Sequence, residues 1–194
     1  MQNPTDTLSS DARSEFNIRR QYGLSSDTRL LLLGFGGHDT KWNGLQDSYL
    51  PEGWHCFVLR ASDADIPSSR FHALPVDTYV PAFISQVDVV IGKMGYGTVS
   101  ECLTAGRVLC YIPRVHWPEE DALASLLNQY NAGIKLPLDA FLEGNWADVL
   151  EEALRRKNSW QLDKSQWLVP NDATGSMVAL LEQVVTNLPP LSCR

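Results

Sequence analysis

The sequence has no long hydrophobic run and no apolar segment near its start. The leucine run Leu30–Leu33 holds four residues, whereas a helix that spans a membrane needs about 20. Residues 1–15 are polar and include acids, without the apolar core of a secretory signal. We therefore expect no transmembrane helix and no signal peptide, and a cytoplasmic location.

The sequence also lacks an excess of positive charge. It holds 16 lysine and arginine residues against 23 aspartate and glutamate residues, for a net charge of −7. Proteins that follow a nucleic-acid backbone present a basic stripe to its phosphates. We therefore expect neither nucleic acid nor an anionic membrane as a partner. A small phosphorylated ligand remains compatible with this charge, because backbone N–H groups at a helix start bind phosphate.

Cysteine is scarce, and its spacing matches no metal motif. The four cysteines are Cys56, Cys102, Cys110 and Cys193, and no zinc pattern relates them. No Ser/His/Asp arrangement can be argued from spacing either. We expect reduced, structural thiols and no metal site.

Short apolar runs alternate along the chain with segments of helical periodicity. Uniformly apolar strands that alternate with helices indicate a parallel sheet covered on both faces. We therefore predict an α/β fold, a Rossmann-like doubly wound parallel sheet of about six strands with helices on both faces. The expected strands are 29–35, 55–61, 71–75, 87–92, 107–113 and 132–137, and the expected helices are 13–22, 77–87, 98–106, 119–131, 145–157 and 174–187.

The expected domain organisation is simple. Residues 1–22 should form a disordered N-terminus and a short linker helix, and residues 160–172 an extended connection. Residues 23–188 should form one Rossmann-like domain, followed by the tail 189–194. In such sheets ligands bind beyond the carboxyl ends of the strands, where the strand order reverses.

Two glycine-rich loops, 34–42 and 92–101, each follow an expected strand. Neither matches the P-loop or the dinucleotide fingerprint. In the second loop, Gly95 and Gly97 permit positive φ and close approach of a ligand. Thr98 as the N-cap would leave free N–H groups at the positive end of a helix. This favours an anion site, such as one for pyrophosphate, although a plain tight turn explains the glycines as well.

Glu101 has two interpretations of similar weight. Thr98-Val99-Ser100-Glu101 fits the capping box, in which the glutamate bonds back to the N-cap N–H. Alternatively, the Glu101 carboxylate accepts hydrogen bonds from a ligand diol such as ribose.

The segment 114–122 opens another expected helix with acidic residues. Glu119 and Glu120 suit the positive end of a helix dipole without any ligand. They could equally bind sugar hydroxyls, with Arg114 holding a phosphate and His116 and Trp117 shaping the pocket.

Two further cations are candidates from the glycine loops. His38 could donate to a phosphate or stabilise a leaving group, and is the one, weak, catalytic candidate. Lys93 could neutralise a phosphate. Each is equally explained as a solvated surface side chain.

Four segments carry a family resemblance: FGGHDTKW, LPEGWHCFVL, GKMGYGTVSE and PEEDALASLLNQYNAG. Over roughly residues 28–157 the sequence resembles the C-terminal, donor-binding domain of GT-B glycosyltransferases of family 28, which are MurG-like. Within that group it most resembles the glycosyltransferase-like region of plant L-arabinokinases.

The resemblance implies a domain that binds a nucleotide-diphosphate sugar, usually UDP-linked, as substrate and uses no further cofactor. It places residues at the diphosphate, at the ribose hydroxyls, near the donor sugar and along the cleft wall. These are respectively Gly95, Tyr96, Gly97 and Thr98; Glu101; Glu119 and Glu120; and Gly36, Gly37 and His38.

The resemblance also implies a partner. GT-B enzymes react in the cleft between two Rossmann-like halves, and the acceptor binds to the N-terminal half. This chain has room for one half, so we expect the other in a separate chain or in a longer polypeptide. It would then be a hexosyltransferase donor domain, incomplete alone; the alternative is a non-catalytic nucleotide-sugar sensor.

Overall fold

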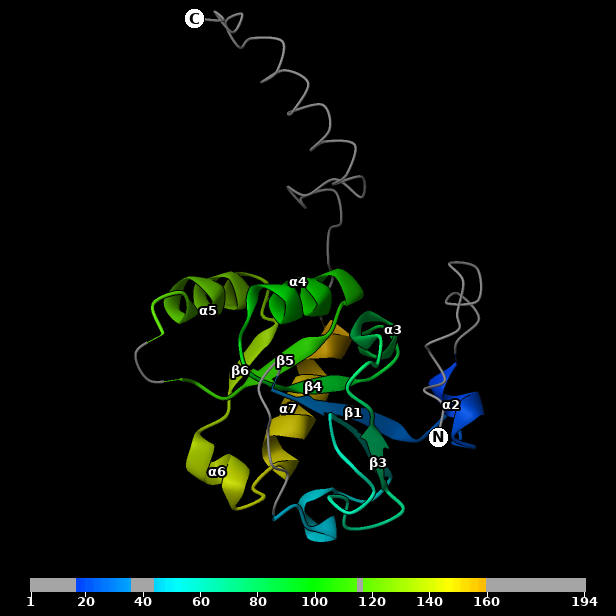
Figure 1. Ribbon diagram of the computed structural model, residues 1–194. Helices are drawn as coiled ribbons and strands as arrows, with labels where there is room; N and C mark the ends of the chain where they lie inside the picture. Colours follow the sequence, from blue (N-terminus) through cyan, green and yellow to red (C-terminus); the bar gives the residue numbers. More distant parts are fainter. Residues whose placement is uncertain (1–16, 36–43, 115–116, 160–194) are drawn as a thin grey trace, which may run out of the picture. The chain divides into compact units, whose positions relative to one another are not determined.

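The computed structural model describes residues 17–35, 44–114 and 117–159. They form a six-stranded sheet with helices on both faces (Figure 1). All of them belong to one compact unit within residues 1–160.

The sheet is parallel throughout and has the order β3-β2-β1-β4-β5-β6. The chain builds outward from β1 in one direction and then returns to build outward in the other. The switch point therefore lies between β1 and β4, and the predicted doubly wound topology is confirmed. The strands are β1 Arg29–Gly34, β2 Trp54–Leu59, β3 Phe71–Leu74, β4 Val89–Gly92, β5 Val108–Tyr111 and β6 Gly133–Lys135.

The helices lie close to the expected segments, with two additions. A 3-10 turn, η1, and a short helix, α6, were not expected from periodicity. The helix expected over 77–87 is shorter than predicted, and Pro81 stands at its start. The elements are α2 Ile18–Gln21, η1 Asp47–Tyr49, α3 Val80–Ile84, α4 Tyr96–Ala105, α5 Glu120–Gln129, α6 Leu138–Leu142 and α7 Ala147–Ser159.

Several expectations lie outside the described residues. They are the N-terminal segment 1–16, the connection 160–172, the helix 174–187 and the tail 189–194. These segments, and with them the expected domain boundaries, stay predictions.

Alternate residues of the central strands face opposite layers of helices. Figure 1 shows α3, α4 and α5 over one face and α7 over the other. Leu31 and Ile91 belong to the core on the α7 side, together with the fully buried Trp146. Leu32 and Val90 instead line a cavity beneath α3 and α4. This two-residue period is what a strand buried on both faces requires.

Polar contacts tie the elements together near the amino end of the sheet. The Asp88 carboxylate, directly before β4, accepts a hydrogen bond of 2.8 Å from the Leu30 backbone N–H. It also pairs with Lys157 near the end of α7 and lies 3.7 Å from Arg19 in α2. These contacts stabilise the end of the sheet that faces away from the carboxyl-end loops.

At the carboxyl end, β1 and β4 approach each other through two glycines. Gly34 and Gly92 are paired in the sheet. A Cβ at Gly92 would lie 2.1 Å from the Gly34 carbonyl oxygen, and one at Gly34 would lie 2.5 Å from Leu59 Cδ1. The switch point therefore has room for hydrogen only at Gly92, whereas a side chain at Gly34 would require Leu59 to shift.

We expect Gly92→Ala to destabilise the fold by about 3 kcal/mol, at the upper end for overpacking, because the clash is with backbone. Gly97→Ala is the matched control, since a Cβ there meets nothing within 4 Å. It should stabilise α4 by about 0.5–1 kcal/mol. Urea unfolding of both variants measures the difference, and a neutral Gly92→Ala would contradict the close approach.

A histidine pair bridges β2 and β3. His55 Nδ1 and His72 Nε2 lie 2.9 Å apart, and His72 stacks on Phe57 with 4.8 Å between ring centroids. Burial, and then the charge of His55, lower the pKa of His72 to about 4. The folded state therefore favours neutral His72.

This pair should make stability depend on pH. The unfolded chain binds a proton at His72 near pH 6.5, whereas the folded chain binds it near 4. The free energy of unfolding should thus fall as pH drops from about 6.5 towards 4. His72→Phe should reduce this slope in urea titrations across the same range, and an unchanged slope would contradict the assignment.

Candidate functional site

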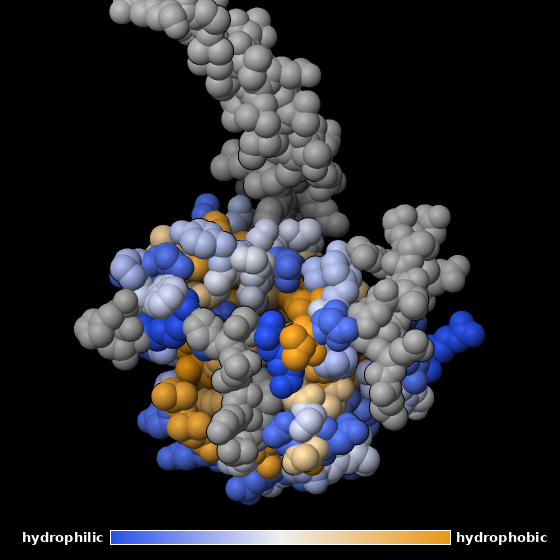
Figure 2. All heavy atoms as spheres, in the orientation of Figure 1, coloured by the Kyte–Doolittle hydropathy of each residue, from blue (hydrophilic) through white to orange (hydrophobic). Residues whose placement is uncertain are grey.

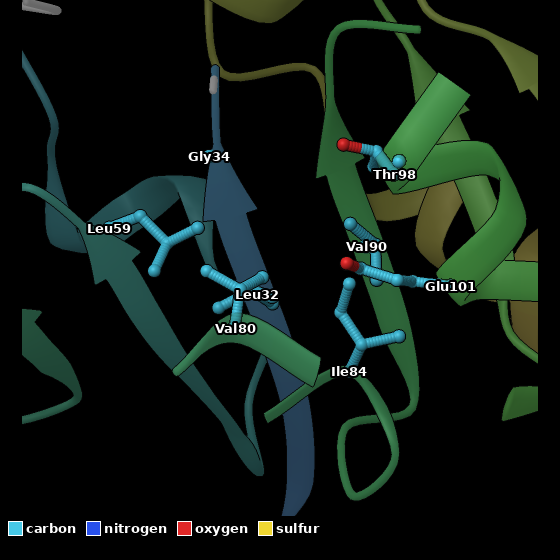
Figure 3. A pocket seen from close by; sticks show the side chains of 9 residues that line it. Leu32, Gly34, Leu59, Val80, Ile84, Val90, Thr98 and Glu101 are labelled. Carbon is cyan, nitrogen blue, oxygen red and sulfur yellow. The ribbon is translucent and has the colours of Figure 1, made fainter. Parts of the chain in front are cut away.

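A cavity of about 230 Å³ lies at the switch point, beneath α3 and α4. Most of its wall is apolar, and Figure 3 shows its polar groups, the Thr98 hydroxyl and the Glu101 carboxylate, entering from α4. It is smaller than the roughly 300–1,000 Å³ typical of whole-ligand pockets, so it suits part of a ligand. Its lining residues are Leu32, Gly34, Leu59, Val80, Ile84, Val90, Gly97, Thr98 and Glu101.

The helix beside this cavity begins earlier than the sequence predicts. The N-cap of α4 is Gly95, with φ −137° and no side-chain hydrogen bond. Thr98 is a helical residue within the first turn, so its prediction as the N-cap is wrong. Positive φ is likewise not used at Gly95 or at Gly97. A glycine N-cap escapes the usual search for a Ser, Thr, Asp or Asn cap.

What the two glycines provide is open space. A Cβ at Gly95 or Gly97 would meet nothing within 4 Å, and Tyr96 between them is 66% exposed. The backbone N–H groups that open α4 are therefore accessible from outside. Such groups carry the positive end of the helix dipole.

Glu101 lies in the second turn of α4 and is half-buried. With Gly95 as the N-cap, the capping-box interpretation of this residue is wrong. Among the described residues, no hydrogen bond or ion pair involves its carboxylate. Burial raises its pKa above the ordinary value. The helix thus directs a partly desolvated acid into a largely apolar cavity.

Lys93 lies between β4 and α4. Its Nζ lies 5.6 Å from the centroid of the Phe35 ring, which follows β1. Burial, and then the charge of Arg114, lower the pKa of Lys93. A partly desolvated cation here favours the approach of an anion.

Arg114 and Glu120 are placed against each other. Arg114 Nε donates to Glu120 Oε1 at 2.6 Å, and the Arg114 backbone N–H donates to Oε2 at 2.8 Å. Glu120 is 7% exposed. Glu119 is half-buried at the N-cap of α5 and has no hydrogen bond from its side chain to the start of the helix.

The structure brings together two sets among the described candidates. Gly97, Thr98 and Glu101 share the cavity, whereas Arg114 and Glu120 join the loop after β5 to the loop after β4. The other described candidates, Lys93, Gly95, Tyr96 and Glu119, belong to neither set, and Gly36, Gly37, His38 and His116 lie outside the described residues.

The apolar cavity wall was not predicted as part of the site. Leu59, Val80 and Ile84 come from β2 and α3, which carry no glycine loop or charged motif. Their only signal in the sequence is hydrophobic periodicity, which marks core and cavity residues alike.

Exposed hydrophobic side chains gather in the segments that follow the strands. In the described part of the chain, the exposed large hydrophobics outside α5 all lie after the carboxyl ends of β3 to β6. Figure 2 shows hydrophobic residues over α6, where Leu142 is 61% exposed. The set is Val76, Tyr79, Tyr96, Trp117, Leu138 and Leu142.

Residues 17–35, 44–114 and 117–159 contain no group of three His, Cys, Asp or Glu side chains placed to hold a metal ion. In the same residues, no helix is long and apolar enough to cross a membrane.

No family model matches the chain. L-arabinokinase of Arabidopsis thaliana is 34% identical to it over 149 residues, which cover 77% of this chain. The chain spans 14% of that relative's length.

Solved glycosyltransferase structures share its architecture. MurG of Acinetobacter baumannii matches 87% of this chain with 53% of its own, at 19% identity and a TM-score of 0.53. The calicheamicin glycosyltransferase CalG4 matches 81% with 44% of its own, at 17% identity and a TM-score of 0.54. The chain has the fold of one half of a GT-B glycosyltransferase.

A third match to this GT-B half is Arabidopsis thaliana UGT89C1, whose structure is complexed with UDP. It aligns over 90% of this chain and 46% of its own, at 11% identity and a TM-score of 0.50. The chain thus covers about half the length of these structural neighbours, and membership of family 28 stays a prediction.

At neutral pH, Glu101→Gln should raise the free energy of unfolding, because burial disfavours the charged form. The gain should fade as pH drops to about 4.5, the ordinary pKa of the group, since the carboxyl is then increasingly protonated. The control Glu152→Gln breaks an ion pair with Arg156 and should lose about 0.3–0.5 kcal/mol. Urea unfolding distinguishes them, and a loss of stability for Glu101→Gln at neutral pH would contradict the desolvation of this carboxylate.

Proposed function

We propose that the chain is the donor-binding half of a glycosyltransferase and binds a nucleotide-diphosphate sugar, UDP-linked, at the switch point between β1 and β4. The observation that carries the proposal is Glu101. It is a half-buried carboxylate that burial penalises and that no described residue satisfies. A diol that donates two hydrogen bonds would compensate that penalty.

The cavity binds the nucleoside part of the nucleotide, and the start of α4 binds the diphosphate part. The largely apolar cavity of about 230 Å³ accommodates the nucleoside. The ribose hydroxyls then lie at Glu101 and at the neighbouring Thr98. The diphosphate then lies over the open main chain of Gly95, Tyr96 and Gly97. Backbone N–H groups and the helix dipole supply the attraction there.

Lys93 and the opening of α4 would also act in the reaction. Negative charge develops on the diphosphate as the bond to the sugar breaks. N–H donors and a partly desolvated ammonium already in place stabilise that charge without reorganisation.

The donor sugar would lie towards the start of α5. The family resemblance assigns both Glu119 and Glu120 to it. Because the two oxygens of Glu120 already accept bonds from Arg114, Glu119 is the acid that remains for sugar hydroxyls. Gly36, Gly37, His38 and His116 keep the roles expected from the sequence.

A second Rossmann-like half would complete the enzyme and bring the acceptor. Two observations support this. The structural neighbours extend over about twice the matched length. The exposed hydrophobic side chains of this chain gather on the segments after β3 to β6, as an interface requires.

We expect calorimetric titration to show binding of UDP and UDP-sugars. Glu101→Ala should weaken UDP binding by about tenfold or more, the value of a hydrogen bond to a charged group. The wild-type chain should bind UDP more tightly than 2′-deoxy-UDP, and Glu101→Ala should bind both alike. Wild-type affinity should fall with pH earlier than an ordinary glutamate predicts, because the ionised form binds the diol.

Absence of nucleotide binding in the wild-type chain would refute the donor-site proposal. Sugar transfer by this chain alone would instead refute the need for a second half. Thermal unfolding of Glu101→Ala serves as the control for folding.

A further inference from the structure

One cluster of contacts joins the loop after β5 to the loop after β4. Beyond its two bonds with Glu120, Arg114 donates from Nη2 to the Met94 carbonyl oxygen at 2.6 Å. Met94 directly precedes Gly95, the N-cap of α4. The guanidinium therefore contacts the main chain at the point where the chain enters the proposed diphosphate site.

The surroundings of this cluster hold it in one arrangement. Glu120 is 7% exposed and Met94 is 1% exposed. The Trp117 ring covers the guanidinium, with 4.0 Å from Arg114 Cζ to the ring centroid. The Arg114 guanidinium donates to Glu120 and to Met94 along its edges, and its face stacks on Trp117. These contacts leave the planar group little conformational freedom.

The start of α4 has no side-chain cap of its own. Its N-cap is a glycine without a side-chain bond. The preceding main-chain tie is the bond from the Ile112 N–H to the Gly92 carbonyl oxygen, 2.9 Å long. Between that tie and the first turn of α4, the bond from Arg114 to Met94 fixes the path of the loop.

We propose that Arg114 is a positioning residue for the diphosphate. It orients the opening of α4 through the Met94 carbonyl, and the buried Glu120 carboxylate orients Arg114. This inference rests on the proposed function, because it concerns the affinity of the same site for nucleotide.

The direction in which UDP affinity changes when Glu120 is removed distinguishes the two possible roles of Arg114. If Arg114 bound the phosphate directly, removing the neighbouring negative charge of Glu120 would leave UDP binding unchanged or strengthen it. If Arg114 acts by holding the loop, removing Glu120 releases the guanidinium and weakens UDP binding. The two roles therefore give opposite outcomes for one substitution.

The experiment compares titrations of UDP and of uridine. Glu120→Ala and Arg114→Lys should each weaken UDP binding by about tenfold. Uridine affinity should change by less than about twofold, because ribose is held at Glu101. Arg114→Lys keeps the charge but loses the planar fork that donates from Nε to Glu120 and from Nη2 to Met94. The control Asp121→Ala removes an exposed acid from the same turn of α5 and should leave UDP affinity unchanged.

The double variant Arg114→Lys/Glu120→Ala should lose no more UDP affinity than Arg114→Lys alone, since both changes break one contact. It also avoids leaving a buried acid unpaired, so it covers the case in which a single variant fails to fold.

Equal loss of uridine and UDP affinity would indicate a merely structural role and overturn the proposal. So would unchanged or tighter UDP binding by Glu120→Ala. Wild-type chain that binds neither probe would refute the proposed function itself.

Discussion

The structure depends on the contact between two main chains where β1 and β4 end. Gly34 and Gly92 allow these strands to stay paired up to their last residues, with no side chain between them. The loop after β4 then leaves the sheet at its centre, and α4 starts beside the switch point. The cavity, the open first turn of α4 and the direction of Glu101 all follow from that geometry.

The amino end of the sheet contributes to stability, and the carboxyl end carries the proposed binding site. Near the amino end, Asp88 satisfies a backbone N–H and a lysine, and so stabilises the meeting of β1, β4 and α7. At the carboxyl end, Glu101 is half-buried without a partner among the described residues, and its pKa is raised. A group that destabilises its own fold is common at a binding site, where a ligand compensates it.

Much of the fold could be predicted from the sequence, because the central strands β1, β4 and β5 are nearly continuous apolar runs and the main helices carry apolar residues at three- and four-residue steps. The start of α4 could not, since a glycine N-cap has no side chain to indicate it and Thr98 imitates one. The Arg114–Glu120 pair was also missed. Arg114 and Glu120 are six residues apart in the sequence, but the role of the pair depends on the contact with Met94. Met94 comes close to Arg114 only when the sheet has formed. The apolar cavity residues of α3 could not be recognised either, because in the sequence their hydrophobic periodicity is the same as that of core residues.

The exposed hydrophobic side chains after β3 to β6 have a consequence for handling the molecule. At neutral pH the charge of −7 keeps copies apart, but the isoelectric point is about 5.0. Near that pH the mutual repulsion vanishes while Tyr96, Trp117 and Leu142 remain in contact with water. Colloidal stability of the chain, studied without a companion half, is therefore expected to be poorest in mildly acidic, high-salt buffers.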